Sequence, residues 1–107
     1  MRGAAAFGRL FRQGRRIEGD HLQLLAAPAE GTIGRVGYVI GKQQLTLAVD
    51  RNRLKRMLRE KVRRRRPALD AFDIILRLRR ACPPTQIASV GAEAAQLLDA
   101  LAPAGPR

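Results

Sequence analysis

The residues best suited to chemistry in this sequence are the arginines and lysines crowded between residues 51 and 66. This segment reads RNRLKRMLREKVRRRR, and its only acidic residue is Glu60. A guanidinium group binds phosphate through planar, paired hydrogen bonds. Like charges three or four residues apart destabilise an isolated helix unless an anion neutralises them. A solvated helix face is the ordinary explanation of a charge run, but it fits poorly where acidic partners are so few. The segment therefore predicts a binding site for a polyanion.

The whole chain shares this excess of positive charge. Its 107 residues include 21 Lys and Arg against 9 Asp and Glu, which gives a formal net charge of +12. Nucleic acid is the commonest polyanionic partner of a small domain this basic. An anionic membrane or an acidic helical partner is the alternative from another class, but the basic stripe carries few of the bulky apolar residues that either would need.

Groups able to catalyse a reaction are scarce. Cys82 is the only cysteine and His21 the only histidine, so neither a disulfide nor a cysteine-based zinc site is possible within the chain. We expect His21 to be an ordinary strand residue. Asp70 and Asp73 flank the start of a predicted strand and form no catalytic pair. We therefore expect no catalytic residue and no metal ligand, and a reduced, cytoplasmic setting.

The basic residues require a helix to position them. Apolar residues gather on one side at about 100° per residue, and they are Leu47, Leu54, Met57, Leu58 and Val62. The neighbouring arc is formed by Arg51, Asn52, Lys55, Arg56, Arg59, Arg63 and Arg66. We expect this helix to be capped by Thr46 or Asp50 and stopped by Pro67.

The remaining elements predict a single α+β domain over residues 1–107, with loose ends at 1–6 and 102–107. Phe7 and Phe11 predict a short helix ending near Gly14, which keeps the Arg-rich N-terminus within the fold rather than in a targeting peptide. Alternating apolar residues predict one or two strands between residues 15 and 27, another around residues 33–40, and a buried one over residues 73–79. Residues 88–101 predict a closing helix. The order is helix, strands, basic helix, strand, helix, with the helices packed on an open, roughly four-stranded sheet.

Three aromatic residues and one amide allow two interpretations each. Phe7, Phe11 and Tyr38 are either core residues or a stacking surface for unpaired bases. The amide of Asn52 is suited either to a base edge or ribose, or to the local backbone at the start of the helix. The residues alone do not decide between these roles.

Residues 48–60, AVDRNRLKRMLRE, resemble the signature helix of the bacterial ribonuclease P protein component. In that family an Arg-Asn-Arg core is followed by an apolar residue, Lys-Arg and a further Arg, as in Arg51 to Arg56 and Arg59 here. The segment RVGYVIGK at residues 35–42 is similar to the strand that precedes this helix. FGRLFRQG at residues 7–14 and DIIL at residues 73–76 are similar to the family's first helix and later strand. The resemblance covers roughly residues 7–80.

The resemblance implies an α/β sandwich that serves as one subunit of the ribonucleoprotein that removes 5′ leaders from precursor tRNA. Cleavage would belong to the catalytic RNA with Mg²⁺, so the protein alone would be neither catalytic nor metal-binding. The protein would be monomeric outside the holoenzyme. The contacts with the catalytic RNA that it implies are Arg51, Asn52, Arg53, Lys55, Arg56 and Arg59, and the basic arc of the same helix adds Arg63 as a candidate. The contacts with the single-stranded leader that it implies are Phe7, Phe11 and Lys42, and Tyr38 joins them as a candidate for base stacking.

The chain departs from the family at Gln43, where a second basic residue usually follows Lys42. We therefore expect weaker leader binding with an intact RNA-binding helix. A ribosomal-type protein that binds structured RNA without a part in catalysis is the alternative function. Gel shifts against ribosomal RNA and ribonuclease P RNA would separate the two.

Overall fold

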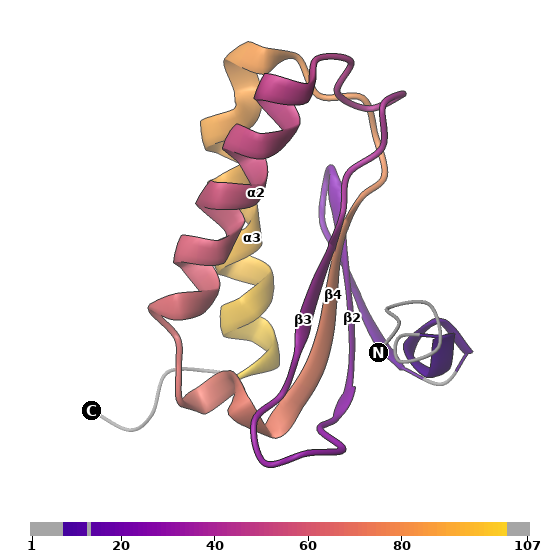
Figure 1. Ribbon diagram of the computed structural model, residues 1–107, viewed down its shortest axis with the longest axis vertical. Coiled ribbons are helices and arrows are strands. Elements are labelled where there is room, and N and C mark those ends of the chain that lie inside the picture. The colour runs from indigo at the N-terminus through magenta and orange to yellow at the C-terminus, as the bar shows by residue number, and fades with distance from the viewer. Residues whose placement is uncertain (1–7, 13, 103–107) are drawn as a thin grey trace.

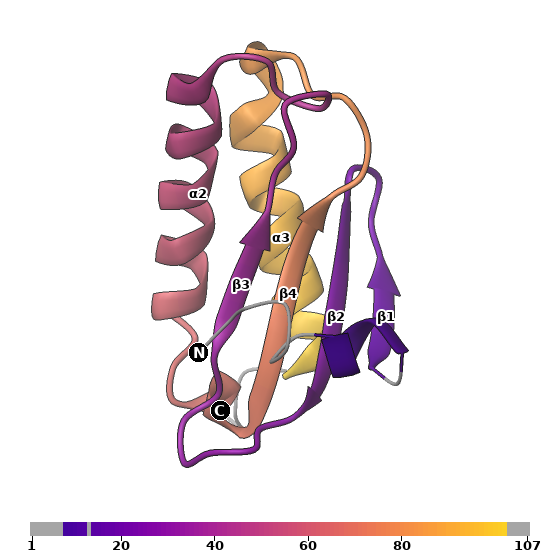
Figure 2. The same ribbon diagram turned by 45° about the vertical axis from the view of Figure 1, so that its right-hand side comes forward.

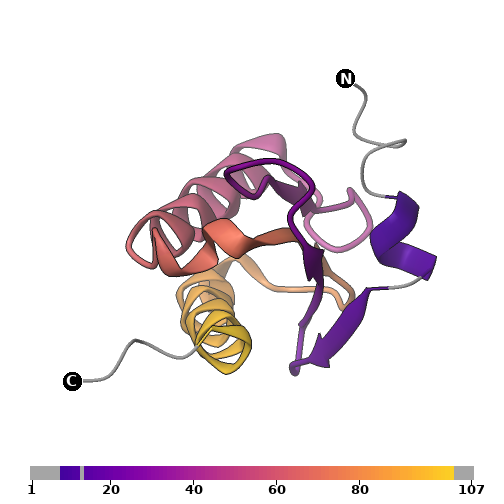
Figure 3. The same ribbon diagram turned by 90° about the horizontal axis from the view of Figure 1, so that it is seen from below.

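The computed structural model describes residues 8–12 and 14–102, which form a mixed β-sheet and a layer of two helices packed on it. Helices α2 (Ala48–Arg63) and α3 (Ile87–Leu101) lie side by side on one face of the sheet (Figure 1). A short N-terminal helical segment, residues 8–12, lies on the opposite face (Figure 3). We call this opposite face, away from α2 and α3, the open face. The arrangement confirms the predicted α+β class.

The sheet has four strands in the order β1-β2-β4-β3. Their bounds are β1 Arg15–Glu18, β2 Leu22–Pro28, β3 Val36–Val39 and β4 Phe72–Leu78. The pairs β1–β2 and β2–β4 are antiparallel, whereas β3 and β4 are parallel neighbours joined through α2 (Figure 2). Two 3₁₀ turns, Ala68–Ala71 and Pro84–Gln86, precede β4 and α3 respectively.

Strands β2 and β4 are apolar on both faces because each face is covered by a helix along part of its length. Leu24, Ile74 and Leu76 point into the main core under α2 and α3. Leu25 and Ile75 belong to a smaller cluster that packs against Leu10 of the N-terminal helical segment. Alternate residues of a strand point to opposite faces. In β2 and β4 the even-numbered residues therefore face the main core and the odd-numbered residues face the open face.

Helix α2 packs on the core through Leu54, Leu58 and Val62, as predicted. The predicted cap was wrong, because the N-cap is Leu47 and no side chain caps the helix. Leu47 therefore precedes the first turn and is 58% exposed rather than part of the apolar side. The helix also ends at Arg63, earlier than Pro67 predicted.

Helix α3 confirms the predicted closing helix and packs on α2 and the sheet. Its residue Gly91 lies under Met57 of α2, and a Cβ at that position would come 2.3 Å from the Met57 sulfur. The absence of a side chain therefore lets the two helices approach closely. No helix among the described residues is long and apolar enough to cross a membrane. The predicted loose ends lie outside the described residues, apart from Ala102.

Candidate nucleic-acid interface

The solvent-facing side of α2 carries polar and charged side chains that have no hydrogen-bond or ion-pair partner among the described residues. They are Asn52, Arg53, Lys55, Arg56 and Lys61. Four of the five are cations, so this side of the helix offers unneutralised positive charge. Four of the seven residues predicted to contact the catalytic RNA are in this set.

Arg51 is directed differently. Its Nη1 atom donates hydrogen bonds to the carbonyl oxygens of Leu45 and Thr46, each at 2.8 Å. Leu45 is buried in the core, so these bonds tie the first turn of α2 to the loop that enters it. The guanidinium group therefore serves the protein's own backbone in this structure.

Glu60 neutralises the arginines at the end of α2. Its carboxylate accepts hydrogen bonds from Arg63 and, at 3.0 Å, from Arg64. The hydrogen bond from Arg63, followed by that from Arg64, lowers the pKa of Glu60 to about 2. The pairing leaves Arg63 less available to phosphate than Arg53.

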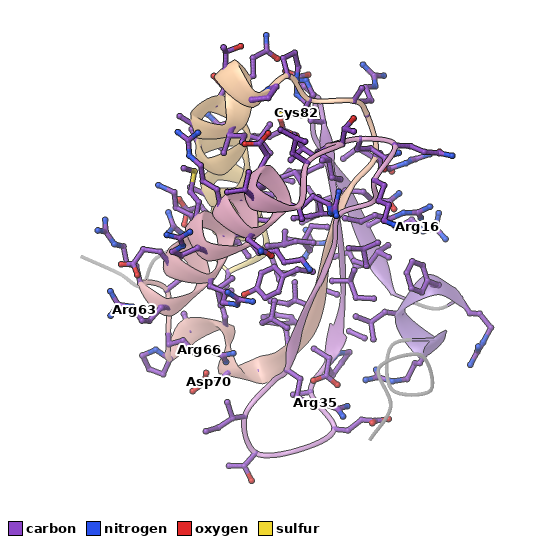
Figure 4. All side chains as sticks on the ribbon, turned by 45° about the horizontal axis from the view of Figure 1, so that its top comes forward. Arg16, Arg35, Arg63, Arg66, Asp70 and Cys82 are labelled. Carbon is purple, nitrogen blue, oxygen red and sulfur yellow. The ribbon has the colours of Figure 1, made fainter. Side chains whose placement is uncertain are left out.

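The last two arginines of the run are also paired. Arg65 donates to Asp99 of α3 at 2.7 Å. Arg66 pairs with Asp70 and donates to the carbonyl oxygen of Gly34 at 3.0 Å, which joins the end of α2 to the start of β3 (Figure 4). Within the described part of the chain, Arg53, Lys55 and Arg56 in the first half of the basic run therefore have no hydrogen-bond or ion-pair partner, Arg51 bonds to the backbone, and the arginines from Arg63 to Arg66 are all ion-paired.

Tyr38 of β3 lies on the side of the sheet that faces α2, not on the open face. It pairs in register with Leu76, and its ring packs against the main core. The Arg59 guanidinium carbon lies 5.8 Å from the ring centroid, a cation–π distance. Burial raises the pKa of Tyr38, and the charges of Arg59 and Arg66 only partly offset that effect.

Phe11 lies on the other side of the sheet. Its side chain is 37% exposed, and the Arg77 guanidinium carbon lies 5.7 Å from its ring centroid. The structure therefore does not bring Phe11 and Tyr38 together, although both were predicted to contact the leader. Phe7 lies outside the described residues.

Lys42 is exposed in the loop between β3 and α2 and has no recorded partner within the described part of the chain. The carbonyl oxygen of Gly41 accepts hydrogen bonds from the backbone N–H groups of Gln44 and Leu45, at 3.2 and 3.1 Å. These hydrogen bonds, together with those from Arg51 to the carbonyl oxygens of Leu45 and Thr46, hold the loop that carries Lys42 at the start of α2.

Asp73 is a buried carboxylate whose role the sequence does not indicate. Arg9 donates to it at 2.7 Å, and Arg35 donates through its backbone N–H at 2.9 Å and its guanidinium at 3.4 Å. The backbone N–H of Glu30 completes the set at 3.4 Å. Burial opposes ionisation, but the hydrogen bonds from Arg35 and Glu30 outweigh it and lower the pKa of Asp73. The available signal was an acidic residue directly before the apolar run from Ile74 to Leu76.

His21 lies in the turn before β2, one residue outside the strand in which it was predicted. The Oε2 atom of Glu93 in α3 accepts hydrogen bonds from the backbone N–H groups of His21 and Leu22, at 2.8 and 2.7 Å. The Oε1 atom of Glu93 lies 3.4 Å from His21 Nδ1. The histidine is therefore part of a contact that holds the β1–β2 turn on α3. Among the described residues, no group of three His, Cys, Asp or Glu side chains could hold a metal ion.

A groove of about 440 Å³ runs along the α3 side of α2. Its lining residues are Arg53, Arg56, Met57, Glu60, Lys61 and Arg64. The floor is partly apolar because Met57 lies against Gly91, whereas the rim is mostly cationic. The sequence pattern did not single out Lys61 and Arg64, because at helical spacing Lys61 falls among the apolar residues of the helix and Arg64 falls beside Met57.

Comparison with known proteins supplies the family context. The sequence profile of the Ribonuclease P family matches residues 1–102. The chain is 35% identical over 92 residues to the ribonuclease P protein component of Azotobacter vinelandii, a match that covers 86% of this chain and 71% of that protein. It is 45% identical over 65 residues to the corresponding component of Chromohalobacter salexigens, covering 61% of this chain and 51% of that protein.

Solved structures share the fold. The RNase P protein of Staphylococcus aureus superposes with a TM-score of 0.79 at 22% identity, covering 98% of this chain and 96% of that one. The RNase P protein of Thermotoga maritima gives a TM-score of 0.76 at 24% identity, with 94% of each chain covered.

Proposed function

The chain belongs to the ribonuclease P protein family and is a protein component of the tRNA 5′-processing ribonucleoprotein, and from that premise we propose that two separate surfaces bind two RNAs. The exposed side of α2 binds the catalytic RNA. The open face of the sheet, with the Lys42 loop beside it, holds the single-stranded 5′ leader of precursor tRNA.

The observation that carries the first assignment is the set of unpaired cations on α2. Phosphate contacts release counterions, so each contact adds to the salt dependence of binding. If the four unpaired cations of α2 all meet phosphates, affinity for the catalytic RNA falls about 150-fold between 50 and 200 mM salt. The paired arginines near the end of the helix contribute less, because an RNA phosphate must first displace Glu60 or Asp99.

The open face supports the second assignment through its chemistry. Phe11 offers an exposed aromatic ring, and Lys42 and Arg77 offer positive charge. Unpaired bases stack on aromatic rings, whereas bases inside a duplex are already stacked on one another. A surface of this kind fits the leader, which is single-stranded, better than it fits the helical body of tRNA.

The protein contributes binding rather than bond cleavage in this proposal. We assign the Mg²⁺ ions required for hydrolysis to the RNA subunit, as the family resemblance implies. By holding the leader and neutralising phosphates, the protein increases affinity for the precursor and lowers the Mg²⁺ concentration that the ribonucleoprotein needs. The proposal includes a cytoplasmic location, where tRNA precursors are processed, and a monomeric state outside the holoenzyme.

The test is cleavage of a precursor tRNA by bacterial ribonuclease P RNA at low Mg²⁺, with and without this protein. We expect saturable activation at stoichiometric protein and no cleavage by the protein alone. Substituting Arg53, Lys55 and Arg56 together with alanine should abolish activation. Arg80→Ala, which removes an exposed charge beyond the end of β4, is the matched control. Tight RNA binding without activation, or a preference for ribosomal RNA, would overturn the proposal in favour of a ribosomal-type role.

A further inference from the structure

Arg77 lies on the open face near the end of β4, next to the row of residues covered by the N-terminal helical segment. It lies on the central strand β4, opposite Gln23 of β2 and Val39 of β3. On the far side of Gln23, Glu18 of β1 completes one continuous row across the four strands. Ile75, two residues earlier and on the same face, is covered by Leu10. Arg77 is thus the first residue of β4 on this face beyond the apolar cluster under that segment.

This arginine has no carboxylate partner within the described part of the chain, although it is half-buried. The nearest acids are engaged elsewhere. Glu18 accepts a hydrogen bond from Gln23 at 2.6 Å and lies 3.6 Å from Arg79. Asp73 is paired with Arg9 and Arg35. A partly desolvated charge without a counter-ion is costly, which indicates that an anion from another molecule completes the site.

The recorded contact of Arg77 is the ring of Phe11, at a cation–π distance of 5.7 Å. Arg16 of β1 holds the backbone of Phe11 in place, because its Nη2 atom donates a hydrogen bond to the Phe11 carbonyl oxygen at 2.8 Å. Figure 4 shows Arg16 on the side of the N-terminal helical segment. Val39, 42% exposed, flanks Arg77 on the neighbouring strand. An exposed ring, a guanidinium group and an aliphatic side chain from three elements thus lie together on a rigid sheet.

We propose that Arg77 and Phe11 together bind one nucleotide of the single-stranded leader, with Arg77 contacting its phosphate and Phe11 stacking on its base. The proposal rests on the leader-binding function proposed above and adds a residue that the family resemblance does not assign. A phosphate supplies the anion that Arg77 lacks, and an unpaired base uses the ring surface that remains exposed. Duplex RNA would satisfy the charge alone, since its bases are not free to stack.

The experiment measures the affinity of the reconstituted holoenzyme for precursor tRNA with a 5′ leader and for mature tRNA. Arg77→Ala should weaken precursor binding about five- to tenfold, as expected for loss of a charge-assisted contact and a supported stacking surface, and should leave mature tRNA unchanged. Arg77→Lys should keep the salt dependence and recover only part of the affinity, because lysine lacks the planar group. Arg80→Ala is the charge-matched control, and thermal unfolding of each variant verifies the fold.

A double-mutant cycle with Phe11→Ala tests the joint site. The combined variant should lose less than the product of the two single losses, because each residue supports the same nucleotide. Equal weakening of precursor and mature tRNA, or no effect of Arg77→Ala and Arg77→Lys, would overturn the inference. If Phe11→Ala weakens precursor binding and the Arg77 variants do not, only this inference fails. If neither Phe11→Ala nor Lys42→Ala affects precursor binding, the proposed leader surface fails with it.

Discussion

The Nη2 atom of Arg9 lies 2.7 Å from Oδ2 of Asp73, so one ion pair fastens the N-terminal helical segment to the central strand of the sheet. Two residues after Arg9, Phe11 is thereby held over the open face beside Arg77. The same carboxylate receives Arg35 from the loop before β3. This buried acid therefore acts with the apolar packing of Leu10 to place the segment that carries Phe11.

Replacement of Asp73 by asparagine should destabilise the fold and weaken leader binding together. The variant leaves Arg9 without its nearest carboxylate, so we expect the free energy of unfolding to fall by about 2–3 kcal/mol. Denaturant titration measures this loss. Affinity for precursor tRNA should fall while affinity for the catalytic RNA changes little, because α2 lies on the other side of the sheet. Equal loss of both affinities would contradict a specific role in placing Phe11.

The pH dependence of this variant gives a second measurement. The pKa of Asp73 is lowered in the folded state, so its stabilising effect is complete above the unfolded-state value of about 4 and is lost as the pH falls below it towards the folded-state value. Asparagine does not titrate. The difference in unfolding free energy between wild type and Asp73→Asn should therefore be constant near neutral pH and shrink below about pH 4.

Local patterns predicted the elements well because each has a clear apolar period. Leu54, Leu58 and Val62 at helical spacing placed α2, and the apolar run beginning at Ile74 placed β4. The cap was mispredicted because Thr46 and Asp50 have suitable side chains, whereas the backbone starts the helix after Leu47 without using either. Propensity alone cannot show which candidate the entering loop allows.

The candidate site was less predictable, because pairing between distant residues decides which charges are free. Arg53 and Arg65 look alike in the sequence, but only Arg65 meets Asp99, 34 positions further along the chain. Arg77 and Tyr38 likewise depend on strand register, which assigns them to opposite faces of the sheet. Composition and periodicity contain neither kind of information.

Arg51 and Arg53 should respond differently to alanine substitution, although both belong to the Arg-Asn-Arg core. Arg53 has no recorded partner among the described residues, so its loss should lower affinity for the catalytic RNA and reduce the slope of log K against log salt by about 0.9. Arg51 bonds to the carbonyls of Leu45 and Thr46, so its loss should loosen the Lys42 loop and leave that slope nearly unchanged. Filter binding across a salt series measures both slopes.

Hydrogen exchange provides the control for this pair of variants. Arg51→Ala should accelerate exchange in residues 41–47, whereas Arg53→Ala should not. Arg51→Lys, which can still donate to a carbonyl oxygen, should restore part of the protection. If Arg51→Ala instead lowers the slope of log K against log salt by about 0.9, the value for one phosphate contact, then the Arg51 guanidinium leaves the loop and binds RNA.

The groove on the α3 side of α2 predicts an extension of the RNA-binding surface beyond the basic arc. Lys61 lines this groove and has no recorded side-chain partner within the described residues. Lys61→Glu should weaken binding to the catalytic RNA by about tenfold, because it removes one attraction and adds one repulsion. Discrimination between precursor and mature tRNA should not change. Arg65→Ala removes a charge that Asp99 already neutralises, so it should have a much smaller effect in the same assay. A larger effect of Arg65→Ala than of Lys61→Glu would show that the groove does not bind the catalytic RNA.

Gln43 offers a test by gain of function. It is exposed beside Lys42 in the loop at the entrance to α2, so a second cation there would face the same phosphates as Lys42. Gln43→Lys should raise affinity for precursor tRNA by about two- to fivefold and increase the salt slope by about 0.7, the value for one contact with a single strand. Affinity for mature tRNA should stay constant. Ala100→Lys adds the same charge at the exposed far end of α3 and should change neither affinity. If both variants raise both affinities alike, net charge alone accounts for the gain and the Lys42 loop does not contact the leader.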